Sequence, residues 1–569
     1  MKFWNSLKKI PLPLLVFFLS LIVYNLNFRS ITSMDSTPAA LLPFSLIYNH
    51  NLYLDQFVKY FQVPGQKPLY FWGFARGHWY SAYPVVLPII ISPLYWLVLK
   101  MLSFNSSNIP AMIAFANFME KFSASLVAAL SVSFIFLLLR KTNKQYALFL
   151  TFTYAFATST WVISSQALWQ HGLSQLFIIL ALLTFYQAQE NDNYLYLSGL
   201  FASLAVAERY PNFIFALFML VLVFYIYRQR VIKFVLPCLL VGPLLLGYNL
   251  YVYGSIKGGY ILPFKRGIFE GLSLLFFYPN KGLFIYTPVT IFSFLGIYFF
   301  LKRYKLYEKL HIKSIYLVSI GSIISGSILL SKWPGLGGSS YGPRFFTDLL
   351  PFFVILLVPF IEGIVLIEKK AKKLVISLFV LAVLFSFLVQ VIGAFFYSGV
   401  DGPANSSFAD WRSSQIVKAI RLGPYTRPYI DFAYQIGWLK QNELLPATAL
   451  KAKIKIKSGR SKLKVGELSN YLIEITNTSK EIWPRGWDSS QMRSILITSF
   501  FINSKGDAYQ GISWLVSKSL RPNQKIDMDF LAEAPSKPGK YTLKFDLQQE
   551  FVVWFNQPTQ LRVQVSALR

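Results

Sequence analysis

The stretch LVISLFVLAVLFSFLVQVIGAFF, residues 374–396, decides the fold class of this chain. It contains no charged residue, and the lysine-rich segment 369–373 stands directly before it. A helix needs roughly 20 apolar residues to cross the hydrocarbon core of a bilayer. The stretch therefore predicts a transmembrane helix with a basic flank at its N-terminal end.

Similar apolar runs recur along most of the chain. The 569 residues are 54% hydrophobic and 18% aromatic, with a mean hydropathy of +0.46, which is far more apolar than a soluble domain. We predict a polytopic α-helical membrane protein with about eleven transmembrane helices and additional interfacial helices. The first run, residues 12–26, is followed by no small-residue cleavage site, so we expect a retained span rather than a signal peptide. The predicted spans are residues 10–27, 111–139, 145–163, 171–189, 193–208, 211–227, 231–253, 283–301, 314–331, 349–367 and 373–397.

The distribution of charge argues against a nucleic-acid partner, and the cysteine content excludes a disulfide or a cysteine-based metal site within one chain. The net charge of +30 would suggest nucleic-acid binding in a soluble protein. Here much of the basic charge lies in short loops between apolar runs, where membrane orientation explains it, so we expect no nucleic-acid partner. The only cysteine, Cys238, lies inside an apolar run, which excludes a disulfide or a cysteine-based metal site within one chain.

The number of predicted spans between one basic cluster and the next is always even. If these clusters are cytoplasmic, the N-terminus is inside and the C-terminal domain is outside. The run at residues 85–102 is left over, and its prolines predict a bent interfacial or re-entrant helix. The basic clusters are residues 140–144, 228–233, 302–313 and 369–373. The segments that this sorting places outside are residues 28–110, 165–172, 207–212, 254–282 and 331–348.

The first outer loop contains two carboxylates, within ITSMDSTPAALLPFSLIYNHNLYLD, residues 31–55. Asp35 stands just past the first span, where a carboxylate loses some solvation and can serve as a proton acceptor. Alternatively, Ser33 or Asp35 caps a helix through TPAALLPF, with Pro38 near its first turn. Asp55 is the weaker candidate, because it can simply begin an interfacial helix.

The outer segments also carry basic side chains among aromatic ones. KPLYFWGFARGHWYSAYP, residues 67–84, contains Lys67, Arg76 and His78, a composition suited to the headgroup level, where cations meet phosphate. Interfacial anchoring alone would give the same composition.

Two further outer loops each present one cation on a glycine-containing turn. In SSYGPRFF, residues 339–346, Arg344 is placed like an anion clamp, or else it is a single snorkelling arginine on a flexible loop. In PNKGLFIYTP, residues 279–288, Lys281 is offered in a similar way.

Other charged residues fit structural roles at least as well. Glu208 and Arg209 are adjacent at a span end, where they can form a local ion pair. His171 in LWQHG fits an interfacial structural residue better than a ligand, and the scattered histidines argue against a histidine-based metal site. Glu120 and Lys121 fall inside a predicted span, where charge is costly and faces protein or a water-filled cavity. The sequence leaves open whether they pair with other helices or line a path.

The last part of the chain changes character. We divide the chain into a transmembrane domain at 1–397, a connector rich in proline, glycine and aromatics at 398–449, and a C-terminal domain at 450–569. Alternating stretches such as KAKIKIK and YLIEITN predict about seven short strands in an antiparallel, immunoglobulin-like β-sandwich. Its tryptophans could stack on sugars, but we favour burial in the core for Trp483, Trp487, Trp514 and Trp554.

The chain contains none of the phosphate-cradling, nucleophile-elbow or HExxH signatures of soluble enzymes, so any chemistry must be built from the outer loops. The order of features over residues 1–400 resembles the GT-C glycosyltransferases. Within them it is similar to bacterial enzymes that use polyprenyl-phosphate sugars, related to the protein mannosyltransferases and the aminoarabinose transferases of lipid A. The resemblance rests on SMDSTPAALLP, HWYSAYP, LWQHG, NKGLFIYTPV and SYGPRFFTDLLP.

The resemblance implies a membrane glycosyltransferase that moves a sugar from a polyprenyl-phosphate carrier to a glycan, lipid or protein acceptor. The reaction would take place at the outer face of a bacterial-type plasma membrane. By motif, Asp35 is the catalytic carboxylate, and cations near the interface must stabilise the leaving phosphate. The candidates for that phosphate are Arg344, Lys281, Arg76 and Lys67, in this order. Residues expected to line the cavity are His78, Tyr83, His171, Arg209 and Tyr341.

The sequence also departs from the family pattern. Relatives often carry a basic residue before the Tyr-Pro of the interfacial helix, where this chain has Ala82. We expect no cofactor; Asp35 and Asp55 could in principle share a divalent metal, but metal independence is favoured. The rival interpretations are a lipid or polysaccharide transporter, which would commonly show internal repeats that we do not find, and a non-catalytic surface assembly protein.

Overall fold

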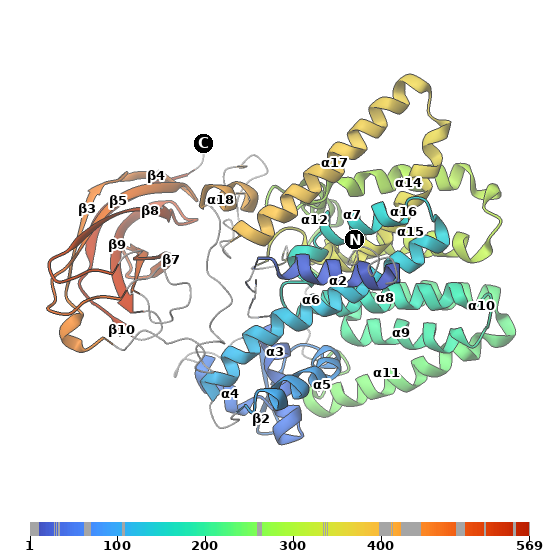
Figure 1. Ribbon diagram of the computed structural model, residues 1–569, viewed down its shortest axis with the longest axis horizontal. Helices are drawn as coiled ribbons and strands as arrows, with labels where there is room; N and C mark the ends of the chain where they lie inside the picture. Colours follow the sequence, from blue (N-terminus) through green and yellow to red (C-terminus); the bar gives the residue numbers. More distant parts are fainter. Residues whose placement is uncertain are drawn as a thin grey trace, which may run out of the picture. The chain divides into compact units, whose positions relative to one another are not determined.

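The computed structural model divides the chain into two compact units, Met1–Gly399 and Val400–Arg569 (Figure 1). The division lies next to the predicted boundary at residue 397, and the residues of the predicted connector from position 400 onward are counted with the second unit. Each unit is described by itself. The structure describes residues 11–27, 29, 31, 33, 35–61, 70–104, 109–258, 264–333, 335, 337, 340–397, 411, 414–422, 445–484, 495–516, 519–549 and 553–567.

The first unit is almost entirely helical, as the apolar runs predict. Five of its described helices are long and apolar enough to cross a membrane: Ala111–Thr142, Arg228–Tyr253, Leu310–Ser331, Arg344–Leu366 and Lys369–Phe396. The helices are α2 (Leu12–Asn25), α3 (Thr37–Phe44), α4 (Asp55–Phe61), α5 (Val86–Met101), α6 (Ile109–Thr142), α7 (Ala147–Phe156), α8 (Gln170–Gln187), α9 (Tyr194–Glu208), α10 (Phe213–Ile226), α11 (Val231–Tyr253), α12 (Ile268–Phe277), α13 (Leu283–Tyr286), α14 (Ile291–Lys302), α15 (Leu310–Ser331), α16 (Leu350–Gly363) and α17 (Lys369–Phe396).

Helix α17 has one apolar face that is exposed and one face that packs against the rest of the unit. Its residues Leu381 and Leu388 are more than half exposed, while Val383 and Gln390 are buried against the unit. A soluble protein rarely leaves such a continuous aliphatic face open, whereas lipid covers it without cost. Helix α11 has the same kind of face, with Leu244 68% exposed. Several apolar helices of this unit are therefore suited to a membrane.

The described residues between α2 and α6 include helices α3, α4 and α5 and a hairpin, which lie beside one end of α6 (Figure 1). Strands β1 (Trp72–Ala75) and β2 (His78–Ser81) are joined by Arg76 and Gly77, whose φ angles are 51° and 82°. Two positive φ values are typical of the tight primed turn that matches strand twist. Helix α5, which the sequence predicts to be interfacial, has 16 residues.

The described residues of the second unit form two β-sheets and the short helix α18 (Gln415–Leu422). One sheet has the order β3-β5-β8, and the other has the order β4-β11-β9-β6-β7 with β10 paired to β9. The prediction of a purely antiparallel structure is wrong for one pair, because β4 and β11 run parallel, with Leu463 opposite Val565. The strands are β3 (Ala452–Ser458), β4 (Lys462–Lys464), β5 (Leu468–Asn477), β6 (Ile495–Asn503), β7 (Ala508–Leu515), β8 (Lys525–Glu533), β9 (Gly539–Gln549), β10 (Val553–Trp554) and β11 (Thr559–Ser566).

Side chains from both sheets form one core. Alternation in β5 and β9 turns Tyr471 and Phe545 inward, and their ring centroids lie 5.5 Å apart across the two sheets. Trp483 is fully buried, and its indole N–H donates to the Ala449 carbonyl at 2.9 Å, which confirms the core interpretation for this tryptophan. Trp514 and Trp554 are partly buried, and Trp487 lies outside the described residues.

Candidate functional site

Asp35 lies at the centre of a polar cluster in the first unit. The Tyr70 hydroxyl donates to Asp35 Oδ1 at 2.6 Å, and the Tyr83 hydroxyl donates to the same oxygen at 2.8 Å. Arg344 Nη1 donates to Asp35 Oδ2 at 2.6 Å, although the two residues are 309 positions apart. A carboxylate and a cation from two different motifs therefore meet directly.

The environment keeps Asp35 ionised. Its side chain is 16% exposed and that of Arg344 is 11% exposed, so water screens the pair only weakly. Burial alone would raise the pKa of Asp35, but the charge of Arg344 and the bonds from Tyr70, Arg344 and Tyr83 together lower it below its usual value. Burial, together with the bond to Asp35 and its negative charge, raises the pKa of both tyrosines, so both remain hydrogen-bond donors.

The helix cap that the sequence offered as an alternative, with Ser33 or Asp35 as the capping residue, is not made, because Ser36 stands at the N-cap position and no side-chain cap hydrogen bond is present there. Helix α3 does begin at the predicted place, with Ser36 as its N-cap and Pro38 in its first turn. The Ser36 hydroxyl donates to the Ser33 carbonyl at 2.8 Å, and the Asp35 backbone N–H donates to Ser33 Oγ at 3.3 Å. These local bonds orient the turn so that the carboxylate points to Arg344.

Arg344 is held by the turn before it and by an aromatic face. It starts the 3₁₀ segment η7 (Arg344–Leu349), two residues after Gly342, whose φ is +66°. A Cβ at Gly342 would lie 2.7 Å from the Tyr286 ring, so both the conformation and the space require glycine. The Arg344 guanidinium carbon lies 4.2 Å from the centroid of the Trp169 ring. The alternative of a snorkelling arginine is wrong, because only 9% of the residue is exposed.

A second buried cluster of charged side chains contacts segment η7 and holds it in place. His171 Nδ1 and Asp348 Oδ1 lie 2.9 Å apart, and the Arg209 guanidinium pairs with the other oxygen of Asp348. Gln175 Nε2 donates to the Thr347 carbonyl at 2.8 Å. Since Asp348 and Arg344 share this short segment, His171 and Arg209 position the arginine rather than form its direct partners.

Glu208 has a different role from that of its neighbour Arg209. Its Oε2 accepts a hydrogen bond from the Leu87 backbone N–H at 3.0 Å, at the first turn of α5. The two residues that the sequence suggested as a local ion pair therefore reach in different directions, Arg209 to η7 and Glu208 to α5.

Glu120 and Lys121, in α6, bond to the last turn of α2 and to residues 166 and 168, which come just before α8. Lys121 Nζ donates to the Tyr24 carbonyl and to Gln166 Oε1, each at 2.6 Å. Glu120 Oε1 accepts from the Leu168 backbone N–H at 3.3 Å. Of the two roles that the sequence left open, these bonds favour pairing with other segments, because both side chains are buried and bonded to the chain on either side of the Asp35 cluster.

Three of the predicted site residues make their contacts at the β1–β2 hairpin. Asp55 Oδ2 lies 2.7 Å from His78 Nδ1, and Asp55 Oδ1 accepts from the Trp79 backbone N–H at 2.7 Å. Arg76 donates from Nε to the Tyr251 carbonyl at 2.5 Å, and its guanidinium carbon lies 4.3 Å from the Tyr251 ring centroid. Asp55, His78 and Arg76 therefore stabilise the β1–β2 hairpin and its contact with α11.

Two other candidates support the loop that precedes Arg344. Lys281 is buried and donates from Nζ to the Ser340 carbonyl. Tyr341 is fully buried, and its hydroxyl donates to the Val389 carbonyl at 3.0 Å, so it packs in the interior instead of lining a cavity. Lys67 lies outside the described residues.

The two acidic candidates do not share a partner. Asp35 bonds Tyr70, Tyr83 and Arg344, whereas Asp55 bonds the hairpin. Within the described part of the chain, no group of three or more histidine, cysteine, aspartate or glutamate side chains could hold a metal ion.

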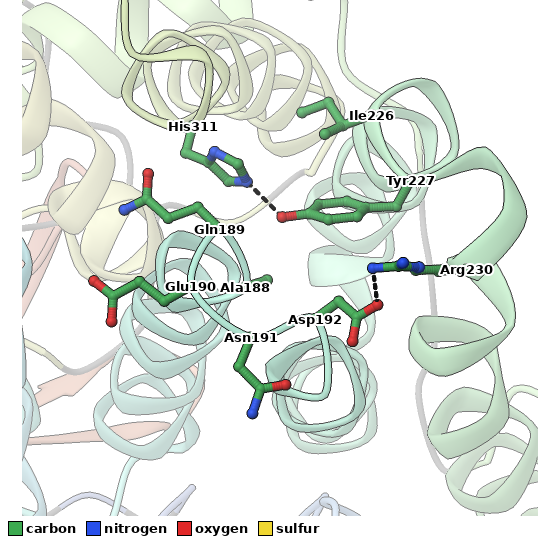
Figure 2. A pocket seen from close by; sticks show the side chains of 9 residues that line it. All are labelled: Ala188, Gln189, Glu190, Asn191, Asp192, Ile226, Tyr227, Arg230 and His311. Atoms are coloured by element: carbon green, nitrogen blue, oxygen red, sulfur yellow. Dashed lines mark hydrogen bonds and ion pairs between the residues drawn. The ribbon is translucent and has the colours of Figure 1, made fainter.

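A separate polar cavity of about 560 Å³ lies where the α8–α9 loop, the α10–α11 junction and the start of α15 meet (Figure 2). Tyr227 Oη and His311 Nε2 lie 2.7 Å apart, and Asp192 pairs with Arg230 and with Lys233. No residue of the Asp35 cluster lines this cavity.

Sequence reasoning missed two residues of the site. Tyr70 is one aromatic residue among many in KPLYFWGF, and no spacing distinguishes it from interfacial anchors. Asp348 belongs to the quoted motif SYGPRFFTDLLP, and an acidic residue just before an apolar run was the signal that could have singled it out.

Of the comparisons with known proteins, the one with solved structures finds matches. No family model matches the chain, and no curated protein matches it. Three solved structures each match about a fifth of the chain. The CARDB domain of a Pyrococcus furiosus protein, solved in complex with di-metal ions, is 21% identical, covers 21% of this chain and 94% of that one, and has a TM-score of 0.15. Spo0M, a sporulation control protein from Bacillus subtilis, is 14% identical, covers 21% and 49%, and scores 0.14. The ASH/PapD-like domain of human CEP192 is 14% identical, covers 22% and 88%, and scores 0.12. At these scores the likenesses carry no argument about fold or activity.

Proposed function

We propose that this chain is a membrane glycosyltransferase of the GT-C type. It takes a sugar from a polyprenyl-phosphate carrier and transfers it to a glycan, lipid or protein acceptor at the extracytoplasmic face. In this proposal the first unit contains about eleven spans with a cytoplasmic N-terminus. The second unit is an immunoglobulin-like β-sandwich on the outer side.

One observation carries the proposal, namely the contact between the largely buried side chains of Asp35 and Arg344, with the hydroxyls of Tyr70 and Tyr83 bonded to the same carboxylate. Transfer from a lipid phosphate needs a base for the acceptor and a cation for the phosphate, held within a few ångströms of each other. The chain contributes both from motifs that the resemblance singled out. The exposed aliphatic faces of α11 and α17 support the membrane setting.

The proposed chemistry uses few groups. Asp35 accepts the proton of the acceptor hydroxyl or amine while the acceptor atom forms a bond to the anomeric carbon. The bond between that carbon and the phosphate oxygen breaks, and its electron pair stays on the phosphate, where Arg344 stabilises the growing charge. The protonated Asp35 then releases its proton to water.

The proposal is tested with Asp35→Asn in the full chain, reconstituted in liposomes. We would supply a panel of radiolabelled polyprenyl-phosphate hexoses and pentoses with membrane extract as the acceptor source, and measure the release of polyprenyl phosphate. We expect the wild type to release it from at least one donor, and Asp35→Asn to lose at least about a hundredfold in rate. Near-normal turnover in this variant, with equal insertion, would remove the proposed base.

A further inference from the structure

The two oxygens of Asp35 have different partners in the resting protein. Oδ1 accepts from both tyrosine hydroxyls, whereas Oδ2 accepts only from Arg344 among the bonds of the described residues. If Arg344 turned to another anion, Tyr70 and Tyr83 would still hold Asp35 in place through Oδ1. Oδ2 is therefore the oxygen that could take a proton, and it is the one that Arg344 occupies.

The surroundings of Arg344 restrict how an incoming anion can reach its guanidinium. Trp169 covers one face of the guanidinium, and the Nε atom is buried and has no hydrogen-bond partner among the described residues. Gly337 lies against this side, since a Cβ built there would be 3.4 Å from Arg344 Cβ and 3.8 Å from Nε. An incoming anion must then use the Nη end of the guanidinium, where Asp35 Oδ2 already sits.

We propose that the lipid-linked phosphate replaces Asp35 Oδ2 on Arg344, and that this exchange turns Asp35 into an available base. This inference rests on the proposed function and adds an order of binding to it. The donor binds first and releases Oδ2 from its ion pair, and only then can the acceptor deliver its proton to Asp35. A phosphate and a carboxylate would repel each other on one guanidinium, so exchange is favoured over sharing.

The exchange predicts that removing the charge of Asp35 improves binding of the phosphate. The carboxylate competes for Arg344 Nη1 and repels the incoming anion, whereas the amide of Asp35→Asn does neither. We expect this variant to bind a sugar-free polyprenyl monophosphate about tenfold more tightly than the wild type does, which corresponds to about 1.4 kcal/mol.

The experiment measures the Kd of long-chain polyprenyl monophosphate for the full chain in nanodiscs, with polyprenol as the uncharged reference. Asp192→Asn is the matched control, because it also removes a carboxylate from an arginine pair but lies at the other cavity (Figure 2). Arg344→Gln should lose phosphate-dependent binding. Melting curves of each variant establish that it is folded.

The outcomes separate the two proposals. Tighter binding by Asp35→Asn with an unchanged Asp192→Asn supports the exchange. Equal or weaker binding by Asp35→Asn, while the wild type clearly prefers the phosphate to polyprenol, overturns the exchange and leaves the proposed function standing. If neither the wild type nor Asp35→Asn distinguishes polyprenyl phosphate from polyprenol, the phosphate site itself is refuted.

Discussion

The contact between Asp35 and Arg344 predicts a strong energetic coupling that a double-mutant cycle can measure. Arg344→Gln leaves a carboxylate that is 16% exposed, still bonded to two tyrosines but without its cation. A fully buried charge stripped of its partner costs about 3–5 kcal/mol, and the remaining tyrosine bonds should reduce this to about 2–3 kcal/mol. Asp35→Asn strands the Arg344 charge in the same way and should cost about 2 kcal/mol.

The double variant leaves neither charge behind. Its destabilisation should therefore fall short of the sum of the single effects by about 1.5–2 kcal/mol. The assay is unfolding of the full chain in mixed micelles with increasing sodium dodecyl sulfate, followed by tryptophan fluorescence. The Arg460–Glu467 pair, whose side chains are 74% and 28% exposed, is the control and should show little coupling. Additive effects at Asp35 and Arg344 would refute the direct pairing.

The same variants should differ in their pH dependence. In the wild type the pKa of Asp35 lies below its ordinary value, so its stabilising contribution is complete above about pH 4 and is lost as the pH falls through the lowered pKa. In Arg344→Gln the largest cause that remains is burial, which raises the pKa. The difference in stability between wild type and Arg344→Gln should therefore be larger at pH 7.5 than at pH 4.5. A difference that does not change over this range would contradict the assignment.

Two predictions concern the support of the site. Gly342→Ala places a methyl group 2.7 Å from the Tyr286 ring at a positive φ, so we expect a loss of about 2 kcal/mol or more in stability and a reduced transfer rate. The control Gly77→Ala meets no neighbour within 4 Å and should retain transfer. Equal transfer rates in the two variants would show that the turn at Gly342 does not position Arg344. Lys121→Met removes the bonds to Tyr24 and Gln166, and we expect faster proteolysis of the loop around Asp35. Lys144→Met, at an exposed position, is the control. An unchanged cleavage rate in Lys121→Met would contradict the anchoring role of Lys121.

Periodicity and length predicted the elements that depend on local pattern. The apolar run at residues 374–396 forms most of α17, and YLIEITN lies in β5 with alternate side chains buried. The parallel pairing of β4 escaped prediction because this strand has three residues, too few to show a period. Strand pairing depends on contacts between distant segments, which a local pattern does not contain.

The sequence proposed Asp35 and Arg344 as separate candidates and did not predict the contact between them. The motifs singled out Asp35 and Arg344, but only the folded chain shows that they touch. Lys281 and Arg76 had the same local signal as Arg344, a cation on a turn, yet their side chains bond backbone carbonyls elsewhere. Burial and partner distance separate these cases, and neither quantity can be read from composition.

The account depends most on the claim that Asp35 is the carboxylate that acts on the acceptor, and the turnover of two matched variants tests it most directly. Asp35→Asn and Asp55→Asn each remove one carboxylate from the segment between α2 and α6, but of the two only Asp35 contacts Arg344. The measurement is the rate of polyprenyl-phosphate release by each variant relative to wild type, in the same liposomes. We predict at least about a hundredfold loss for Asp35→Asn and less than about a threefold loss for Asp55→Asn. Equal losses, or a larger loss for Asp55→Asn, would contradict the account.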